Sequence, residues 1–231
     1  MMQLHPPSVS LLSETDWLLQ FDTGLSIEHN KLIHTLAGII RSGYASWVSD
    51  TVVAYDSLLI RLHKPYAEVD KMIAAAFNQL EQENTQQAPG LVEIPVCYDP
   101  ALSNDLASMA RQTGLQAEEI VHLHSDPVYH IYMLGFLPGF AYMGTVAPSI
   151  ALPRKKEPVP VKTGAVGIAA TQTGIYPTNS PGGWNIVGYT PLVMFNAQRE
   201  PACILSAGQQ VKFVPISFTE FESLQRHEHH H

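Results

Sequence analysis

Residues 135–150 read GFLPGFAYMGTVAPSI, and residues 164–191 read GAVGIAATQTGIYPTNSPGGWNIVGYTP. The stretch from 135 to 191 holds nine of the 15 glycines and eight of the 17 prolines of the chain. Glycine and proline at such density, without a repeat, occur in disordered segments, but here aromatic residues and short apolar runs lie between them. Tight turns between short, bent strands give this texture. We therefore expect a small β-barrel.

The first ninety residues follow strand and helix periods instead. One helix is expected after Ser26, which can cap it, and ends at Gly43. A second is expected to open at Pro65, because apolar residues follow it at helical spacing. Strands are expected over 17–21, 45–48, 51–62 (with a bulge at 55–57) and 91–98. The resulting order βαββαβ is that of a ferredoxin-like sandwich.

These patterns predict an α+β chain of two domains. A ferredoxin-like βαββαβ domain is expected over 1–88 and a β-barrel domain over 89–226, with a polar linker over 81–90 between them. The last five residues, 227–231, read HEHHH and are interpreted as the remains of a purification tag. Further elements are expected in the second domain: helices over 104–112 (capped by Ser103 and ended by Gly114), 117–121 and 218–224, and a last strand over 210–216.

Composition excludes several classes of function. The chain has 231 residues, a formal charge of −8 and only 15% charged residues, so a nucleic-acid binder with a basic face is not expected. Cys97 and Cys203 make neither a disulfide framework nor a zinc cluster, and both are interpreted as buried small hydrophobes. No apolar run has the length of a membrane span, and the N-terminus lacks a basic signal region. A cytoplasmic protein is the expectation.

Histidines and basic residues supply the candidate chemistry. His122, His124 and His130 have no carboxylate or cysteine at ligand spacing, so no metal site is predicted. His124, at an expected corner between helix and strand, is the most interesting of the three. Four basic residues lie within nine positions and are interpreted either as a solvated loop or as a site that attracts an anion: Arg154, Lys155, Lys156 and Lys162.

Two nucleotide and hydrolase motifs are missing from the sequence. The glycines at 164–167 and 182–183 are not followed by the Lys-Ser/Thr of a phosphate-binding loop. Ser180 does not lie in a Gly-x-Ser-x-Gly elbow. Neither ATP binding by this chain alone nor a serine nucleophile is therefore predicted.

Five motifs follow one another in a specific order: GFLPGF at 135–140, PR at 153–154, GAVGIA at 164–169, QTGIYP at 172–177 and SPGGW at 180–184. In this order the chain resembles the family of KipI and the B-type subunit of 5-oxoprolinase. The same domain is called allophanate hydrolase subunit 1 and occurs in the carboxyltransferase part of urea carboxylase. The resemblance extends from about Ser8 to Ile216.

The resemblance implies a small α/β domain followed by a cyclophilin-like β-barrel. It implies a non-autonomous subunit of a heteromeric, ATP-dependent 5-oxoprolinase, which converts 5-oxoproline, ATP and water to glutamate. The implied partners are a larger carboxyltransferase-like subunit, the C type of 5-oxoprolinase, and a further subunit of the A type. Two alternatives remain open: a KipI-type inhibitor that binds a histidine kinase, and a subunit of allophanate or urea metabolism.

The resemblance also marks site residues. Arg154 is expected to bind a carboxylate with its forked guanidinium, and Phe136 and Trp184 are expected to wall the pocket. The polar motif residues are expected to hydrogen-bond an amide or lactam. The substrate-binding candidates are His124, Phe136, Arg154, Gln172, Thr173, Tyr176, Ser180 and Trp184. Four further motif residues are expected to set turns: Pro138, Gly139, Gly182 and Gly183.

Overall fold

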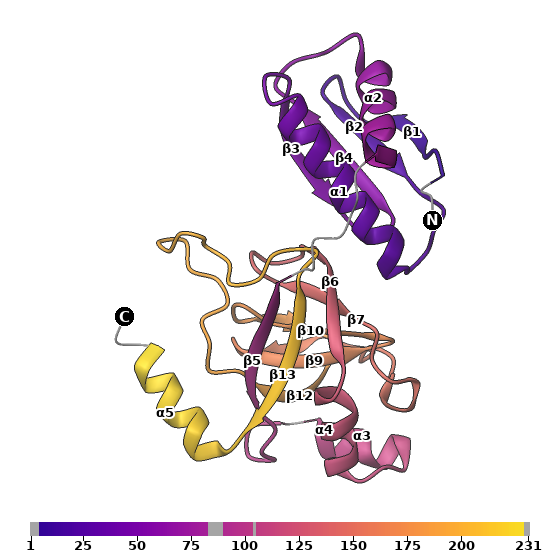
Figure 1. Ribbon diagram of the computed structural model, residues 1–231. Coiled ribbons are helices and arrows are strands. Elements are labelled where there is room, and N and C mark those ends of the chain that lie inside the picture. Colours follow the sequence, from indigo (N-terminus) through magenta and orange to yellow (C-terminus); the bar gives the residue numbers. More distant parts are fainter. Residues whose placement is uncertain (1–4, 83–89, 104, 229–231) are drawn as a thin grey trace. The chain divides into compact units, whose positions relative to one another are not determined.

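A computed structural model describes residues 5–82, 90–103 and 105–228. The chain divides into two compact units, residues 1–88 and 89–231 (Figure 1). The first unit has one antiparallel sheet in the order β1-β2-β4-β3 and two helices. Its elements are β1 (Ser8–Leu11), β2 (Asp16–Gln20), α1 (Ile27–Gly43), β3 (Val48–Val53), β4 (Ser57–Leu62) and α2 (Val69–Gln82).

Helix α1 begins and ends where the sequence predicts. The Ser26 side chain caps it by accepting a hydrogen bond from the His29 amide, and the helix ends at Gly43. Its buried face includes Asn30, which has no exposed surface and donates to the carbonyls of Ala54 and Tyr55. This amide therefore fastens the helix to the turn between β3 and β4.

The predicted βαββαβ order is wrong. Strand β5 (Leu91–Cys97) is part of the barrel, where all seven residues pair in parallel with β13 (Gln210–Ile216). The fourth place in the first sheet belongs to β1, whose four residues are all exposed. The sequence of β1, Ser-Val-Ser-Leu, alternates polar and apolar residues, but four residues are too short a run to distinguish a strand from a loop, so β1 was not predicted.

Three boundaries in the first unit also differ. Residues 45–47 form turns, so the strand predicted over 45–48 is wrong except for its last residue, Val48, where β3 begins. The run 51–62 contains a chain reversal rather than a bulge, because the Ala54 amide bonds to the Ser57 carbonyl between two paired strands. Helix α2 begins at Val69, since the residues after Pro65 form turns before the apolar face begins. The predicted linker lies mostly outside the described residues, as does part of the predicted tag.

The second unit confirms the predicted barrel. Seven strands close in the order β10-β7-β6-β13-β5-β12-β9, with β13 and β5 side by side (Figure 1). Strands β8 (Val159–Val161) and β11 (Ser180–Gly182) form a separate pair. The remaining barrel strands are β6 (Val128–Leu134), β7 (Ala141–Gly144), β9 (Ala165–Ala169), β10 (Gln172–Ile175) and β12 (Asn185–Tyr189).

Alternation along β9 shows how the barrel wall is covered. Val166 and Ile168 belong to the interior core, whereas Ala165 and Ala169 belong to a second buried cluster. Successive strand residues point to opposite faces, so this second cluster covers the outer face of β9. The outer cluster contains most of the aromatic residues that the sequence motifs carry.

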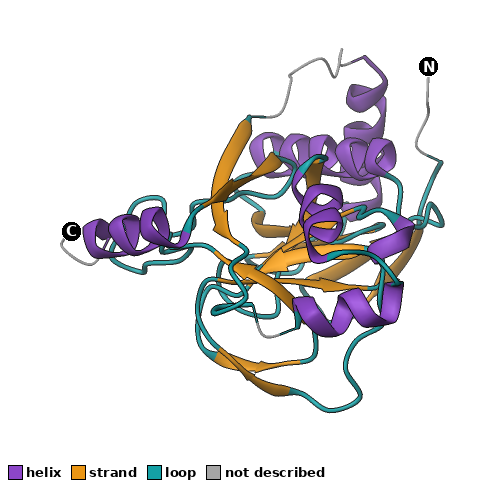
Figure 2. Cartoon of the chain, turned by 90° about the horizontal axis from the view of Figure 1, so that it is seen from below, coloured by secondary structure: helices purple, strands orange, loops and turns teal. Residues whose placement is uncertain are grey.

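The second unit has three α-helices among its described residues, and Figure 2 shows the last of them next to the C-terminus, to one side of the barrel strands. Helix α3 (Leu106–Thr113) ends at Gly114, as predicted, with φ +76°. Helix α4 (Ala117–Ser125) runs beyond its predicted end and thereby carries His124 into the interior. A 3₁₀ turn, η1 (Pro148–Ile150), follows β7 and a last helix, α5 (Phe218–Glu228), follows β13. Ser103 caps no helix, because Asp105 occupies the N-cap position of α3.

Of the two cysteines, Cys97 is buried and Cys203 is partly buried, and both are free thiols. Across the described residues, no helix is both long enough and apolar enough to cross a membrane.

Candidate functional site

The predicted site residues lie in two places, on the two faces of the barrel wall. His124 and Thr173 face the interior, where the His124 Nε2 lies 2.8 Å from Thr173 Oγ1. Tyr176 and Trp184 belong to the outer cluster. Both Thr173 and Tyr176 come from one short motif, and strand alternation separates them.

The interior group is a linear chain of hydrogen bonds from Tyr98 through His124 and Thr173 to the Gly167 carbonyl. The Thr173 hydroxyl donates to the Gly167 carbonyl at 3.1 Å, so it accepts from the Nε2–H of His124. The His124 Nδ1 in turn accepts from the Tyr98 hydroxyl at 2.8 Å. Burial lowers the pKa of His124 to about 3 and raises the pKa of Tyr98, so the imidazole is neutral and the phenol is a donor. With no exposed surface, His124 joins α4 to the barrel and has no contact with solvent.

The outer group is an aromatic cluster made of Phe140, Tyr142, Tyr176 and Trp184. The Phe140 ring meets the other three edge-on, with centroid distances of 4.8 Å to Tyr142, 5.2 Å to Tyr176 and 5.4 Å to Trp184. Edge-to-face contacts of this kind hold rings in fixed orientations. Phe140, Tyr176 and Trp184 are buried and Tyr142 is partly buried, so the aromatic cluster is a rigid, packed support for the residues beside it.

Arg154 lies at the face of this cluster. Its guanidinium carbon is 5.8 Å from the centre of the Trp184 ring, within the range of a cation–π contact. Burial raises the pKa of Tyr142 and that of Tyr176, and the charge of Arg154 opposes the rise in both cases. Both phenols are therefore protonated at neutral pH and able to donate hydrogen bonds beside a fixed positive charge.

Ser180 adds an unsatisfied polar atom. Its hydroxyl oxygen is buried and has no hydrogen-bond partner among the described residues. Buried hydroxyls are nearly always paired, so this oxygen is an exception, but it has almost no accessible surface through which a ligand could reach it. Ser180 begins β11, the strand that leads to Trp184.

The four residues expected to set turns have different structural roles. Gly139 has φ +82° and does lie in a turn, beside the exposed Pro138. Gly182 lies in β11, where a Cβ atom would be 2.4 Å from the Tyr176 hydroxyl. At Gly183 the nearest atom to such a Cβ would be the Lys155 carbonyl oxygen at an ordinary 3.5 Å. Gly182 is therefore needed for close packing against Tyr176.

Two further candidates, Phe136 and Gln172, are not members of the aromatic cluster. Phe136 is 63% exposed, and its ring meets that of Phe140 with centroids 5.6 Å apart. It also has φ +70°, which is strained for a residue with a side chain. Gln172 is partly buried at the start of β10, paired with Gly144 and Ala169.

Sequence reasoning did not single out Tyr142 or Asp105. Tyr142 could have been found, because it lies two residues beyond Phe140 and so shares its face of the chain. Asp105 carried no signal, since its partners, Lys155 and the Ile186 amide, are remote in sequence. Among the described residues, no three His, Cys, Asp or Glu side chains are grouped to hold a metal ion.

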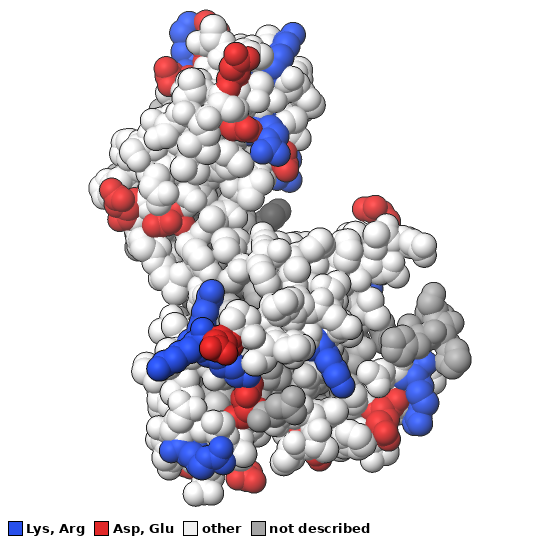
Figure 3. Space-filling model, turned by 180° about the vertical axis from the view of Figure 1, so that it is seen from behind, with Lys and Arg blue, Asp and Glu red and all other residues white. Residues whose placement is uncertain are grey.

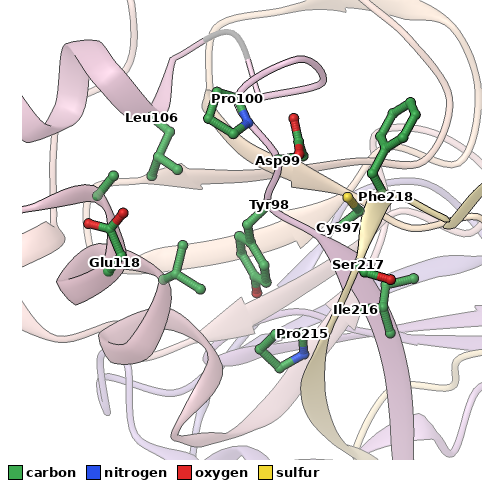
Figure 4. A pocket seen from close by; sticks show the side chains of 12 residues that line it. Cys97, Tyr98, Asp99, Pro100, Leu106, Glu118, Pro215, Ile216, Ser217 and Phe218 are labelled. Atoms are coloured by element: carbon green, nitrogen blue, oxygen red, sulfur yellow. The ribbon is translucent and has the colours of Figure 1, made fainter. Parts of the chain in front are cut away.

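A cavity of about 330 Å³ opens elsewhere on the second unit, between β5, α4 and the start of α5. Figure 4 shows Asp99 and Glu118 on its wall. None of the predicted site residues lines it, and it is lined by no cationic side chain. The aromatic cluster with Arg154 is the better candidate for an anionic ligand, because the cavity would place that ligand beside two carboxylates.

Comparison with known proteins agrees with this architecture. A family model described as carboxyltransferase domain, subdomain C and D, matches residues 7–205. The chain is similar to the B-type subunit of 5-oxoprolinase from Bacillus subtilis (strain 168), with 32% identity over 228 residues, 93% of this chain and 95% of that protein.

Two solved structures are also similar. TTHA0988 superposes with a TM-score of 0.74 at 34% identity, over 87% of this chain, which spans only 40% of that one. The K. lactis urea amidolyase has a TM-score of 0.74 at 16% identity, over 99% of this chain and 16% of that chain, a likeness of fold alone. The region matched by the family model includes nearly all of the first unit, most of the barrel and every candidate site residue. The chain therefore belongs to the carboxyltransferase domain, subdomain C and D, family.

Proposed function

We propose that this chain is a subunit of an ATP-dependent 5-oxoprolinase and that its aromatic cluster, with Arg154, binds 5-oxoproline. The observation that carries the proposal is the 32% identity to the B-type subunit of the Bacillus subtilis 5-oxoprolinase along nearly the whole of both chains. The proposed partners are a larger carboxyltransferase-like subunit, of the C type, and a further subunit of the A type.

The chemistry of the site suits this substrate. 5-Oxoproline has a carboxylate and a lactam on one small, nearly flat ring. Arg154 has no hydrogen bond or ion pair with another described residue, so its guanidinium is free to take the carboxylate through two parallel hydrogen bonds. Tyr142 is only partly buried and is the phenol that we propose as a donor to the lactam oxygen, while the buried Trp184 supports the Arg154 guanidinium through the cation–π contact.

ATP is expected in the complex, and the sequence of this chain has no phosphate-binding loop for it. Its glycine-rich segments lack the Gly-Lys-Ser/Thr sequence that cradles phosphates. Pro158 and Pro160, which have no amide hydrogen to donate, lie between Lys156 and Lys162. We assign nucleotide binding to a partner subunit and 5-oxoproline binding to this one.

Arg154→Lys tests the proposal. Lysine keeps the charge but cannot form the two parallel bonds. Loss of a charge-assisted hydrogen bond lowers kcat/KM for 5-oxoproline by about 10- to 150-fold. The measurement is steady-state kinetics of the reconstituted complex, after size-exclusion chromatography has shown that the complex still assembles.

Lys156→Ala is the matched control. Lys156 is exposed, has no ion pair with a described residue, and is two positions away from Arg154, so we expect less than a twofold change. Equal small effects of both substitutions would show that the basic segment is a solvated loop and that 5-oxoproline binds elsewhere.

A further inference from the structure

The segment that carries Arg154 has no regular secondary structure, yet it is held in place on both sides of Arg154. Before it, the Pro153 carbonyl accepts from the Asn185 side chain at 3.0 Å. After it, the Lys155 amide donates to the Gly183 carbonyl at 2.7 Å. These bonds fix the backbone, but backbone bonds alone do not fix the path of a long side chain.

An ion pair completes the attachment. The Lys155 ammonium lies 2.6 Å from Asp105 Oδ2, and the two side chains are only 24% and 16% exposed. The same Oδ2 accepts from the Ile186 amide at 2.7 Å. One carboxylate oxygen therefore binds the segment of Arg154 to β12, the strand that begins directly after Trp184.

We propose that Asp105 and Lys155 are positioning residues that hold the Arg154 guanidinium over Trp184. Lys155 pairs with Asp105, and Arg154 has no ion pair with a described residue, so its guanidinium is available to a ligand. The inference rests on the proposed function only in taking that ligand to be 5-oxoproline. Its geometric part, the placement of Arg154 over the indole, is independent of the substrate.

Two substitutions remove the ion pair and preserve shape. Asp105→Asn keeps an oxygen that can accept from the Ile186 amide but loses the charge. Lys155→Met keeps most of the length of the side chain without its charge. Lys156→Met is the control, because this neighbour is exposed and has no ion pair with a described residue.

The first readout is the indole N–H signal of Trp184 in spectra of ¹⁵N-tryptophan-labelled chain, assigned by Trp17→Phe and Trp47→Phe. A displaced cation changes this signal, so Asp105→Asn and Lys155→Met should shift it in the direction of Arg154→Ala, and Lys156→Met should not. In the Arg154→Ala background, Asp105→Asn should produce no further shift. This non-additivity separates positioning from a merely structural effect on β12.

The second readout is the kinetics of the reconstituted complex. Loss of a partly buried ion pair that orients a binding group raises KM for 5-oxoproline by about fivefold with little change in kcat. The increase should vanish in the Arg154→Ala background. An unchanged indole signal, or full additivity in both readouts, would overturn the positioning role. If the indole shifts are non-additive while Arg154→Ala leaves KM unchanged, the positioning role stands and the proposed substrate site is wrong.

Discussion

His124 and Arg154 were both marked by the family resemblance, but they lie in opposite environments. His124 is fully buried, neutral and joined to a hydroxyl through each ring nitrogen. Arg154 is exposed, charged and unpaired with any described carboxylate. A buried imidazole with both nitrogens occupied stabilises a fold, whereas a free guanidinium beside aromatic rings is available to a ligand. We therefore assign His124 to stability and Arg154 to binding.

Acid should test the role of His124. Its pKa falls from an ordinary 6.5 in the unfolded chain to about 3 in the folded one. Between these values the unfolded chain binds a proton that the folded chain does not, so acid favours unfolding. The free energy of unfolding should lose about 1.4 kcal/mol for each pH unit below 6.5 on account of this residue. Above pH 6.5 the contribution is complete.

His124→Gln should remove that dependence. The variant is expected to lose about 2–3 kcal/mol at pH 7.5, because the hydroxyls of Tyr98 and Thr173 lose their common partner. Urea unfolding at pH 7.5 and 5.5, followed by near-ultraviolet circular dichroism, measures both effects. His122→Gln, at an exposed position of the same helix, should change stability by less than about 0.5 kcal/mol. A full acid slope in His124→Gln would contradict this assignment.

Neighbouring glycines provide a second test at the same scale. Gly182→Ala places a methyl group where only 2.4 Å separates it from the Tyr176 hydroxyl, so the phenol or β11 must move. We expect a loss of about 1–3 kcal/mol in the free energy of unfolding and weaker use of 5-oxoproline by the complex. Gly183→Ala meets only ordinary contacts and should cost less than about 0.5 kcal/mol. Similar losses in both variants would show that chain flexibility, rather than close packing, requires glycine here.

At the scale of elements, the sequence predicts what local chemistry determines. The strand Gln210–Ile216, the cap at Ser26 and the helix end at Gly114 all agree with the structure. The partners of strands were not predictable in the same way. β5 has the apolar pattern of a strand in either unit, and only its pairing with the distant β13 places it in the barrel.

The candidate site likewise combines residues that the sequence could identify with residues that only tertiary contacts reveal. The motifs identified Arg154, Tyr176 and Trp184, which the structure brings together on the outer face of the barrel. The family resemblance also marked Thr173 and His124, which strand alternation and the extra length of α4 place in the interior. Asp105 depends wholly on tertiary contacts and therefore left no trace in the sequence.

At the scale of the whole molecule, the surface favours association. Only 15% of the residues are charged, and Figure 3 shows wide uncharged areas between the acidic and basic side chains. Interface cores are enriched in aromatic residues and depleted of charged ones. Phe136 is both aromatic and the most exposed of the large apolar residues described, and it lies beside the aromatic cluster. We expect the larger carboxyltransferase-like subunit to bind over this residue.

Phe136→Gly tests that expectation, because its effects on stability and on binding differ. Glycine relieves the strain of φ +70°, by about 1 kcal/mol, and loses an edge contact with Phe140 of similar size. The stability of the isolated chain should therefore change by less than about 1 kcal/mol. The dissociation constant of the complex with the larger partner, measured by calorimetry, should rise about tenfold or more, since buried aromatic anchors dominate binding energy. Phe218→Ser is the control. It changes another exposed ring, on α5, and should leave the dissociation constant within about twofold. An unchanged dissociation constant in Phe136→Gly would place the interface away from the aromatic cluster. The strained backbone of Phe136 would then have to be explained by contacts within this chain.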